Sequence, residues 1–188
     1  QPKETMDLSS LKNGIYLHSW QQTAEAFSAR RSALGRTYRF YLANSYLPRP
    51  GRARACLGLF RGERDFSRFS KKDRTRTVSG LCNVEEAVLK IHEDYALVTV
   101  TADRFLWQMV RRLVGCACEA SSGKLDPDAV RDALDGKGGY RPKPLAPDGL
   151  FLWEVRYPGE LGQQAHELNS IGGVIENRAA ALRGRTAA

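Results

Sequence analysis

The adjacent arginines Arg111 and Arg112 stand in the middle of the apolar segment FLWQMVRRLVG, residues 105–115. A guanidinium group keeps its charge in proteins and forms strong, directional hydrogen bonds with carboxylate and phosphate oxygens. At about 100° per residue, the apolar side chains of this segment form one broad helical stripe, and both arginines lie at its edges. The segment therefore predicts an amphipathic helix that holds fixed positive charge at the border of the core.

Most of the positive charge is concentrated between residues 28 and 76. This stretch holds 14 Lys/Arg residues against three Asp/Glu residues, and the remainder of the chain is net negative, although the whole chain has a formal charge of +8. Arginine binds phosphate oxygens in a bidentate geometry, so this cluster indicates an acidic polymer as partner. The absence of a basic amphipathic helix favours RNA or DNA over anionic lipid. A solvated basic face that only maintains solubility stays open as the alternative.

The four cysteines and three histidines do not have the spacing of a metal or catalytic site. Cys116 and Cys118 are two residues apart, so a helix would direct them about 200° apart and away from a shared ion. The histidines are distant from one another in the sequence. We expect reduced cysteines that pack in the interior, as in a cytosolic protein of this size, and no metal site.

The length and composition predict one globular domain. The 188 residues are 42% hydrophobic and 27% charged, as is ordinary for soluble proteins. No run of about 18 apolar residues occurs, and the first ten residues, QPKETMDLSS, lack the basic and apolar regions of a signal peptide. We therefore expect a cytoplasmic protein that does not contact a membrane.

Aromatic and β-branched residues in alternating patterns predict most of a sheet. The predicted strands are residues 14–20, 36–44, 77–92 and 95–102, the last two forming a hairpin. The two prolines and the glycine of residues 45–54 predict a loop. Residues 55–62 fit either a short helix or a strand.

The second half of the chain predicts a helix, a long loop and a returning strand after the segment 105–115. The proline and acidic residues after Asp126 predict a helix that ends near Asp135. Residues 136–149 predict the loop, and residues 149–157 predict a strand that is apolar on both sides at its start. Together these elements predict an α+β fold, an antiparallel or mixed sheet with helices on one face.

Four segments in order resemble the tRNA pseudouridine synthase A family, in its C-terminal half. They are FSARRSALGRTYRFYL (27–42), GERDFSRF (62–69), FLWQMVRRLVG (105–115) and APDGLFLWEVRY (146–157). The resemblance implies a pseudouridine-synthase-like half domain over residues 27–158. Residues 1–26 would then be the end of a preceding half, and residues 159–188 a polar tail with room for one helix.

The resemblance also implies an activity and partners. Enzymes of this family isomerise uridine to pseudouridine in the anticodon stem-loop of tRNA, as homodimers and without a cofactor. The reaction breaks the N-glycosidic bond, turns the base and rejoins it through carbon, on a nucleotide that is flipped out of the stack. The expected partners are therefore tRNA, a second copy of the chain and the N-terminal half of the enzyme.

The site residues follow from their places in these motifs. By resemblance, Arg111 is the cation that keeps a catalytic aspartate ionised, Tyr38 lies against the target base, and Leu150 closes the wall of the pocket. Surface exposure would also explain Arg111, and core packing would explain Tyr38 and Leu150. Arg112 is expected to meet phosphate or solvent. The residues expected to contact RNA are Arg30, Arg36, Arg39, Arg64 and Lys71.

The sequence departs from the family pattern at the motif of the catalytic aspartate, R-T-D-x-G-V-H-A. No RTD occurs in the 188 residues, and Asp7, the one aspartate before residue 65, lacks those neighbours. We therefore expect the C-terminal part of an enzyme, from a longer chain or a split gene, that is inactive without the missing N-terminal half. Arg64 also stands where the family commonly has histidine. The alternative is a non-catalytic RNA-binding module with the same fold.

Overall fold

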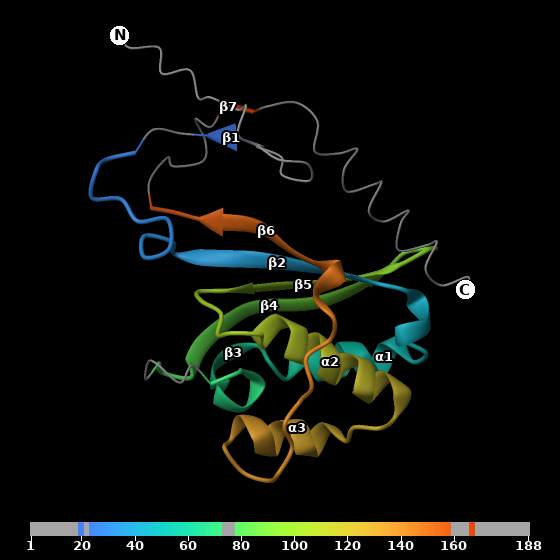
Figure 1. Ribbon diagram of the computed structural model, residues 1–188. Coiled ribbons are helices and arrows are strands. Elements are labelled where there is room, and N and C mark those ends of the chain that lie inside the picture. Colours follow the sequence, from blue (N-terminus) through green and yellow to red (C-terminus); the bar gives the residue numbers. More distant parts are fainter. Residues whose placement is uncertain (1–18, 21–22, 73–77, 159–165, 168–188) are drawn as a thin grey trace.

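The computed structural model describes residues 19–20, 23–72, 78–158 and 166–167 (Figure 1). Its centre is a five-stranded antiparallel sheet in the order β3-β4-β5-β2-β6. A separate pair of short antiparallel strands, β1 and β7, lies beyond β6 in the figure. The strands are β1 (Ser19–Trp20), β2 (Gly35–Leu42), β3 (Gly62–Asp65), β4 (Leu81–Ile91), β5 (Ala96–Ala102), β6 (Leu150–Arg156) and β7 (His166–Glu167).

Helices cover one face of the large sheet, as the pattern of elements predicted (Figure 1). Helix α1 packs against α2 and against strand β4. The α-helices are α1 (Pro50–Gly58), α2 (Met109–Ser122) and α3 (Pro127–Leu134), and the short 3-10 helices are η1 (Asn44–Tyr46), η2 (Ser67–Phe69) and η3 (Pro147–Gly149). The molecule is therefore an α+β fold, in agreement with the sequence prediction.

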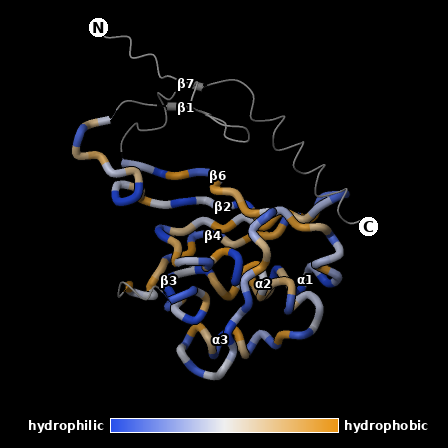
Figure 2. Tube along the Cα trace, in the orientation of Figure 1, coloured by the Kyte–Doolittle hydropathy of each residue, from blue (hydrophilic) through white to orange (hydrophobic). Residues whose placement is uncertain are grey.

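The core fills the space between the sheet and the helices. Phe40 of β2 and Val98 of β5 are buried together with Leu57 of α1 and Leu113 of α2. Figure 2 shows the alternation of hydrophobic and hydrophilic positions that directs one side of each element inward. Burying one such side chain contributes about 1.5–3 kcal/mol, so this layer holds the sheet and helices together.

Strands β4 and β5 form the predicted hairpin, with Ile91 opposite Ala96. The register shifts between Val84 and Glu86, which leaves one additional residue in β4. Because a bulge reverses the side-chain alternation, both Val84 and Ala87 face the core. The long strand β4 therefore keeps buried side chains on its core side before and after the bulge.

The predicted loop over residues 45–54 is wrong in its second half, because α1 begins at Pro50. Proline is tolerated in the first turn of a helix, where its missing N–H has no intrahelical partner to lose. Ala53, Cys56 and Leu57 are buried on the inner side of this helix. Burial thus outweighs the local preference of a segment rich in proline and glycine.

Helix α2 begins later than predicted, at Met109 instead of residue 105. Gln108 adopts a left-handed conformation with φ of 63°, and it is the one non-glycine residue with positive φ in the described part of the chain. Residues 105–107 therefore leave the helix axis and run beside the sheet. The second predicted helix is confirmed as α3, with the Asp126 carboxylate accepting the backbone N–H of Asp128 as an N-cap.

The returning strand β6 is confirmed, but it is more exposed than predicted. It lies at the edge of the sheet, and Leu152 and Trp153 are exposed on it. The register with β2 shifts between Thr37 and Tyr38, so Trp153 is an additional residue in the strand. This bulge interrupts the simple alternation on which the prediction of two apolar sides depended.

Several predictions fall outside the described residues. Of the predicted strand 14–20, the structure describes residues 19–20, which form β1. Most of residues 1–26 and 159–188 is likewise outside, so the boundaries at 27 and 158 stay a prediction. No helix in the described ranges is long and apolar enough to cross a membrane.

Candidate nucleic-acid interface

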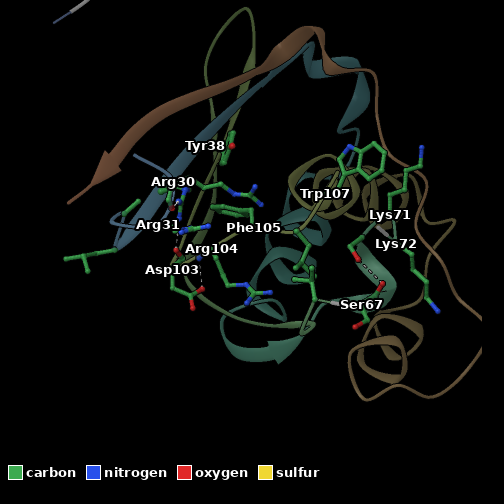
Figure 3. A pocket seen from close by; sticks show the side chains of 16 residues that line it. Arg30, Arg31, Tyr38, Ser67, Lys71, Lys72, Asp103, Arg104, Phe105 and Trp107 are labelled. Atoms are coloured by element: carbon green, nitrogen blue, oxygen red, sulfur yellow. Dashed lines mark hydrogen bonds between the residues drawn. The ribbon is translucent and has the colours of Figure 1, made fainter. Parts of the chain in front are cut away.

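A basic cleft of about 1050 Å³ opens beside the start of β2 (Figure 3). Three segments of the chain line it, within residues 30–38, 67–72 and 103–107, together with Val78. The charged residues of the lining are Arg30, Arg31, Arg36, Lys71, Lys72, Asp103 and Arg104. Six of these seven are basic, so the cleft attracts a polyanion and its walls concentrate the field.

Arg36 holds two of the three segments together. Its Nη1 donates to the backbone carbonyl of Asp103 at 3.2 Å, and its Nη2 donates to the carbonyl of Arg30 at 2.6 Å. A carbonyl accepts a hydrogen bond without neutralising the guanidinium charge. Arg36 therefore positions the cleft wall and still contributes a full positive charge.

The one acidic group of the lining is already used for backbone capping. Asp103 Oδ1 accepts the backbone N–H of Asn83 at 2.8 Å and that of Arg104 at 2.7 Å. The Arg104 side chain donates to the carbonyl of Ser79. The three ion pairs among the described residues lie outside the cleft. Within the described residues, the cations that line the cleft therefore form no ion pair with a carboxylate.

Tyr38 lines the cleft from strand β2, where its side chain is partly buried and packs against the core. Its ring meets Phe105 edge to face, with the centroids 5.0 Å apart and the planes at 86°. This contact fixes the direction of the tyrosine ring before any ligand binds. The cleft thus combines an oriented aromatic ring with unpaired cations, which suits a base joined to phosphates.

The structure brings four predicted residues together in this cleft, namely Tyr38, Arg30, Arg36 and Lys71. The sequence reasoning missed Arg31, Lys72, Asp103, Arg104, Phe105 and Trp107 as lining residues. The sequence predicts both aromatic residues, Phe105 and Trp107, within one helix over residues 105–115, whereas the helix of the structure begins at Met109. The signal that could have identified them is the run RFLW directly after a predicted strand, where a cation and two aromatic residues occur within four positions.

Arg111 and Arg112 have different environments although they are adjacent. Arg111 Nε donates to the carbonyl of Leu145 at 2.5 Å, and the Leu145 N–H donates back to the Arg111 carbonyl. Within the described residues, its two Nη atoms take no hydrogen-bond or ion-pair partner. Arg111 is not among the residues that line the basic cleft. Its guanidinium is therefore anchored at one nitrogen and open at the other two.

Arg112, in contrast, uses both of its Nη atoms in hydrogen bonds within the protein. It donates to the carbonyl of Pro142 through Nη1 and to Gln108 Oε1 through Nη2 at 3.3 Å. Burial lowers the pKa of its guanidinium, and the neighbouring charge of Arg111 lowers it further. The expectation that Arg112 meets phosphate or solvent is therefore wrong, because this side chain ties residues 142–145 to helix α2.

The structure does not bring the other predicted site residues into the basic cleft. Arg39 lies on the opposite face of the sheet, with its guanidinium carbon 3.5 Å from the centroid of the Trp153 ring. Arg64 is exposed on strand β3. Leu150 lies opposite Phe40 at the start of β6 and packs against the core. Their predicted roles depend on the family resemblance and not on this cleft.

The cysteines are free, as expected from the sequence. Burial raises the pKa of the Cys56 and Cys118 thiols to about 12 and that of Cys82 to about 11. Burial likewise raises the pKa of Cys116, which lies 3.3 Å from the Tyr140 hydroxyl. No group of three or more His, Cys, Asp or Glu side chains in the described ranges is arranged to hold a metal ion.

Comparison with known proteins assigns the chain to a family. The family described as tRNA pseudouridine synthase matches residues 57–158, just over half of the chain. The chain belongs to this family. It is 39% identical over 162 residues to "tRNA pseudouridine synthase A" of Chlorobium phaeovibrioides, which covers 78% of this chain and 66% of that protein. The corresponding protein of Thermococcus kodakarensis is 34% identical over 138 residues, covering 73% and 51%.

The chain spans between about half and two thirds of the length of these pseudouridine synthases. The matched residues 57–158 run from the last part of α1 to the end of β6. They include Arg111 and Leu150, and they begin after Tyr38. The membership that the motifs implied is thus confirmed, and the roles of single residues remain to be tested.

Proposed function

We propose that this chain is the part of a tRNA pseudouridine synthase that binds RNA and provides the cation of the active site, for uridines of the anticodon stem-loop. The observation that best supports this is the state of Arg111. Its Nε is fixed by the carbonyl of Leu145, and both Nη atoms are open within the described residues. A guanidinium held in this way is prepared to bind a carboxylate from another segment.

The catalytic carboxylate comes from outside these 188 residues in this proposal, because no RTD motif occurs in them. Arg111 would keep that aspartate ionised and aimed at the target nucleotide, by direct pairing in a partly closed pocket. The N-glycosidic bond breaks, and the base rejoins the ribose through carbon. Leaving the aspartate without its cation would cost about 3–5 kcal/mol, so Arg111 is essential.

Tyr38 and the cleft would hold the substrate. The tyrosine ring lies against the flipped base, and its hydroxyl is available near the base carbon that loses its proton. The cations around it neutralise the phosphates of the stem-loop, and Leu150 closes the pocket on the side of β6. Arg39 and Arg64 would contact RNA beyond the cleft. We further propose that the enzyme acts in the cytoplasm as a homodimer, as its family suggests.

The test is tritium release from tRNA that carries 5-tritiated uridine. The chain is assayed alone and after mixing with a separately expressed N-terminal segment that contains the R-T-D motif. We expect release in the mixture and no release from the chain alone. An Arg111→Ala chain should lower the rate in the mixture by at least about 100-fold, because an unpaired carboxylate costs several kcal/mol.

Arg141→Ala is the matched control, because Arg141 is an exposed arginine at the start of the segment that Arg111 anchors. This variant should retain activity. If the mixture and the chain alone are both silent while tRNA still binds in a salt-dependent manner, the catalytic proposal fails. The chain would then be an RNA-binding module with a synthase fold.

A further inference from the structure

We propose that Trp107 and Lys71 form a second nucleotide position in the cleft, where an unpaired base next to the target nucleotide stacks on the indole ring. This inference rests on the proposed function, since it presumes that RNA occupies the cleft. It adds a site for a neighbouring nucleotide to the position that Tyr38 provides. The occupant is defined by its chemistry as a single-stranded nucleotide with a free base and a phosphate.

Trp107 is unusually exposed for an aromatic residue in a cleft. Its exposed fraction is 57%, while Phe105, two residues earlier, is partly buried and packs against the core. Figure 3 shows Trp107 on the side of the cleft where Lys71 and Lys72 lie, with Phe105 and Tyr38 together on the other side. A large apolar ring that is kept open to solvent among cations is typical of a surface on which bases stack.

The cation beside the ring is placed for a phosphate. Lys71 Nζ lies over one face of the Trp107 ring, 4.2 Å from its centroid, so the base stacks on the opposite face. Such a lysine neutralises a phosphate of the same nucleotide whose base stacks on the ring. Lys72, which also lines the cleft, adds a second positive charge on this side. One pair of side chains thus provides both interactions that single-stranded RNA requires.

The backbone fixes this pair before RNA binds. The Lys71 N–H donates to the Trp107 carbonyl at 2.9 Å, which joins the two segments directly. The left-handed Gln108 then turns the chain into α2, and the Met109 N–H donates to the carbonyl of Leu106 at 3.1 Å. A left-handed conformation is unfavourable for a residue other than glycine, asparagine or aspartate. Here it separates Trp107, whose ring is exposed, from helix α2.

The two aromatic positions are close enough for one RNA strand. The Cα atoms of Phe105, which touches Tyr38, and of Trp107 are at most about 7 Å apart in an extended chain. A strand whose target base lies against Tyr38 therefore reaches Trp107 with a nearby nucleotide. Trp153 offers a contrast, because it is also exposed but is not among the residues that line the cleft.

The experiment follows tryptophan fluorescence in this chain. The sequence contains three tryptophans, Trp20, Trp107 and Trp153. In a W20F/W153F variant the emission comes from Trp107 alone, and in a W20F/W107F variant it comes from Trp153 alone. Each variant is titrated with an anticodon stem-loop RNA, with a short oligouridylate, and with inorganic polyphosphate. Binding of each probe is measured independently by filter retention.

Stacking predicts that both RNAs quench Trp107 and quench it more strongly than Trp153, whereas polyphosphate binds without quenching Trp107. Trp107→Ala should weaken stem-loop binding by about 5-fold to about 100-fold, as for the loss of one stacked base, and Trp107→Phe should restore part of it. RNA binding without quenching of Trp107 would overturn this site and leave the proposed function standing. Failure of RNA to bind at all would overturn both.

Discussion

Two groups of basic residues, most of them within residues 28–76, have different roles in the structure. In the cleft, Arg30, Arg31, Lys71 and Lys72 are exposed and have no carboxylate partner within the described residues. In the second group, which we call the frame, four arginines outside the cleft donate to backbone carbonyls. The frame residues are Arg49, Arg54, Arg68 and, on α2, Arg112.

The comparison shows that a guanidinium serves as a structural clamp, as an electrostatic site or, like Arg36, as both, according to the carbonyls within its reach. Arg49 donates to the carbonyls of Ser121 and Ser122, where α2 ends without intrahelical partners for its last carbonyls. Arg68 donates in the same way to Gly136 and Gly138 beyond α3. Net charge along the sequence therefore overstates the number of residues available to RNA.

The largest expected effect concerns Arg112, which is a half-buried member of the frame. Arg112→Ala should lower the free energy of unfolding by about 2–3 kcal/mol, because it removes a charged hydrogen bond and leaves the Pro142 carbonyl unpaired. Urea denaturation followed by circular dichroism measures this change. Arg141→Ala, an exposed arginine in the same segment, should change it by less than about 0.5 kcal/mol. Unchanged stability in Arg112→Ala would show that the hydrogen bonds of Arg112 do not stabilise the fold, and Arg112 would then not belong to the frame.

The next effect concerns the cleft. A triple variant, Arg30→Ala, Arg31→Ala and Lys72→Ala, should weaken tRNA binding by about 10-fold to about 100-fold and flatten its dependence on salt. Thermal stability should stay the same, since these side chains are exposed. Filter binding at several salt concentrations and a melting curve provide the two measurements. A large loss of melting temperature would show that these residues also belong to the frame.

A smaller effect is expected for Arg49. Arg49→Ala should lower the free energy of unfolding by about 1–2 kcal/mol, because the last carbonyls of α2 lose their donor while this exposed site lets water replace part of it. Arg61→Ala removes the same charge from an exposed position after α1 and serves as control. Both variants should bind tRNA with nearly the same affinity as the unaltered chain. Equal stability losses in the two variants would contradict the clamp.

The smallest effect concerns the pH dependence of stability that arises from the buried thiol of Cys56. The thiol of Cys56 has an ordinary pKa of 9.0, and burial raises it to about 12 in the folded chain. Between these values the unfolded chain loses this proton and the folded chain keeps it, so the free energy of unfolding falls as pH rises. At pH 10 the loss is about 1 kcal/mol. Denaturation at pH 8 and pH 10 should show a smaller fall in Cys56→Ala, and an equal fall would contradict it.

The sequence predicted the elements whose periodicity agrees with their burial. The hairpin of β4 and β5, helix α3 with its Asp126 cap, and the core side of α2 all have patterns that tertiary contacts reinforce. The start of α1 was missed because Pro50 signals a break locally, whereas burial of Leu57 makes the helix favourable. The stabilisation from burying Leu57 depends on tertiary contacts, which a local sequence pattern does not contain.

The candidate site shows the same division. The sequence named Tyr38, Arg30, Arg36 and Lys71, which share the cleft, from motifs and charge. It could not separate Arg39 from them, although alternate residues of a strand face opposite sides and Arg39 meets Trp153 instead. It also included Phe105 in a helix that begins only at Met109. The conformation of Gln108 that separates them is a local deviation without a sequence signal.

The sequence by itself determined the fold class, the family and the excess of positive charge, because periodicity, motif order and composition do not depend on which residues meet in space. Only the tertiary structure decided which charges are free. Arg111 and Arg112 are chemically identical neighbours. Arg111 donates to the Leu145 carbonyl through Nε alone, whereas Arg112 donates to the Pro142 carbonyl and to Gln108. That difference arises from the path of residues 142–145 over α2, and folding alone sets that path.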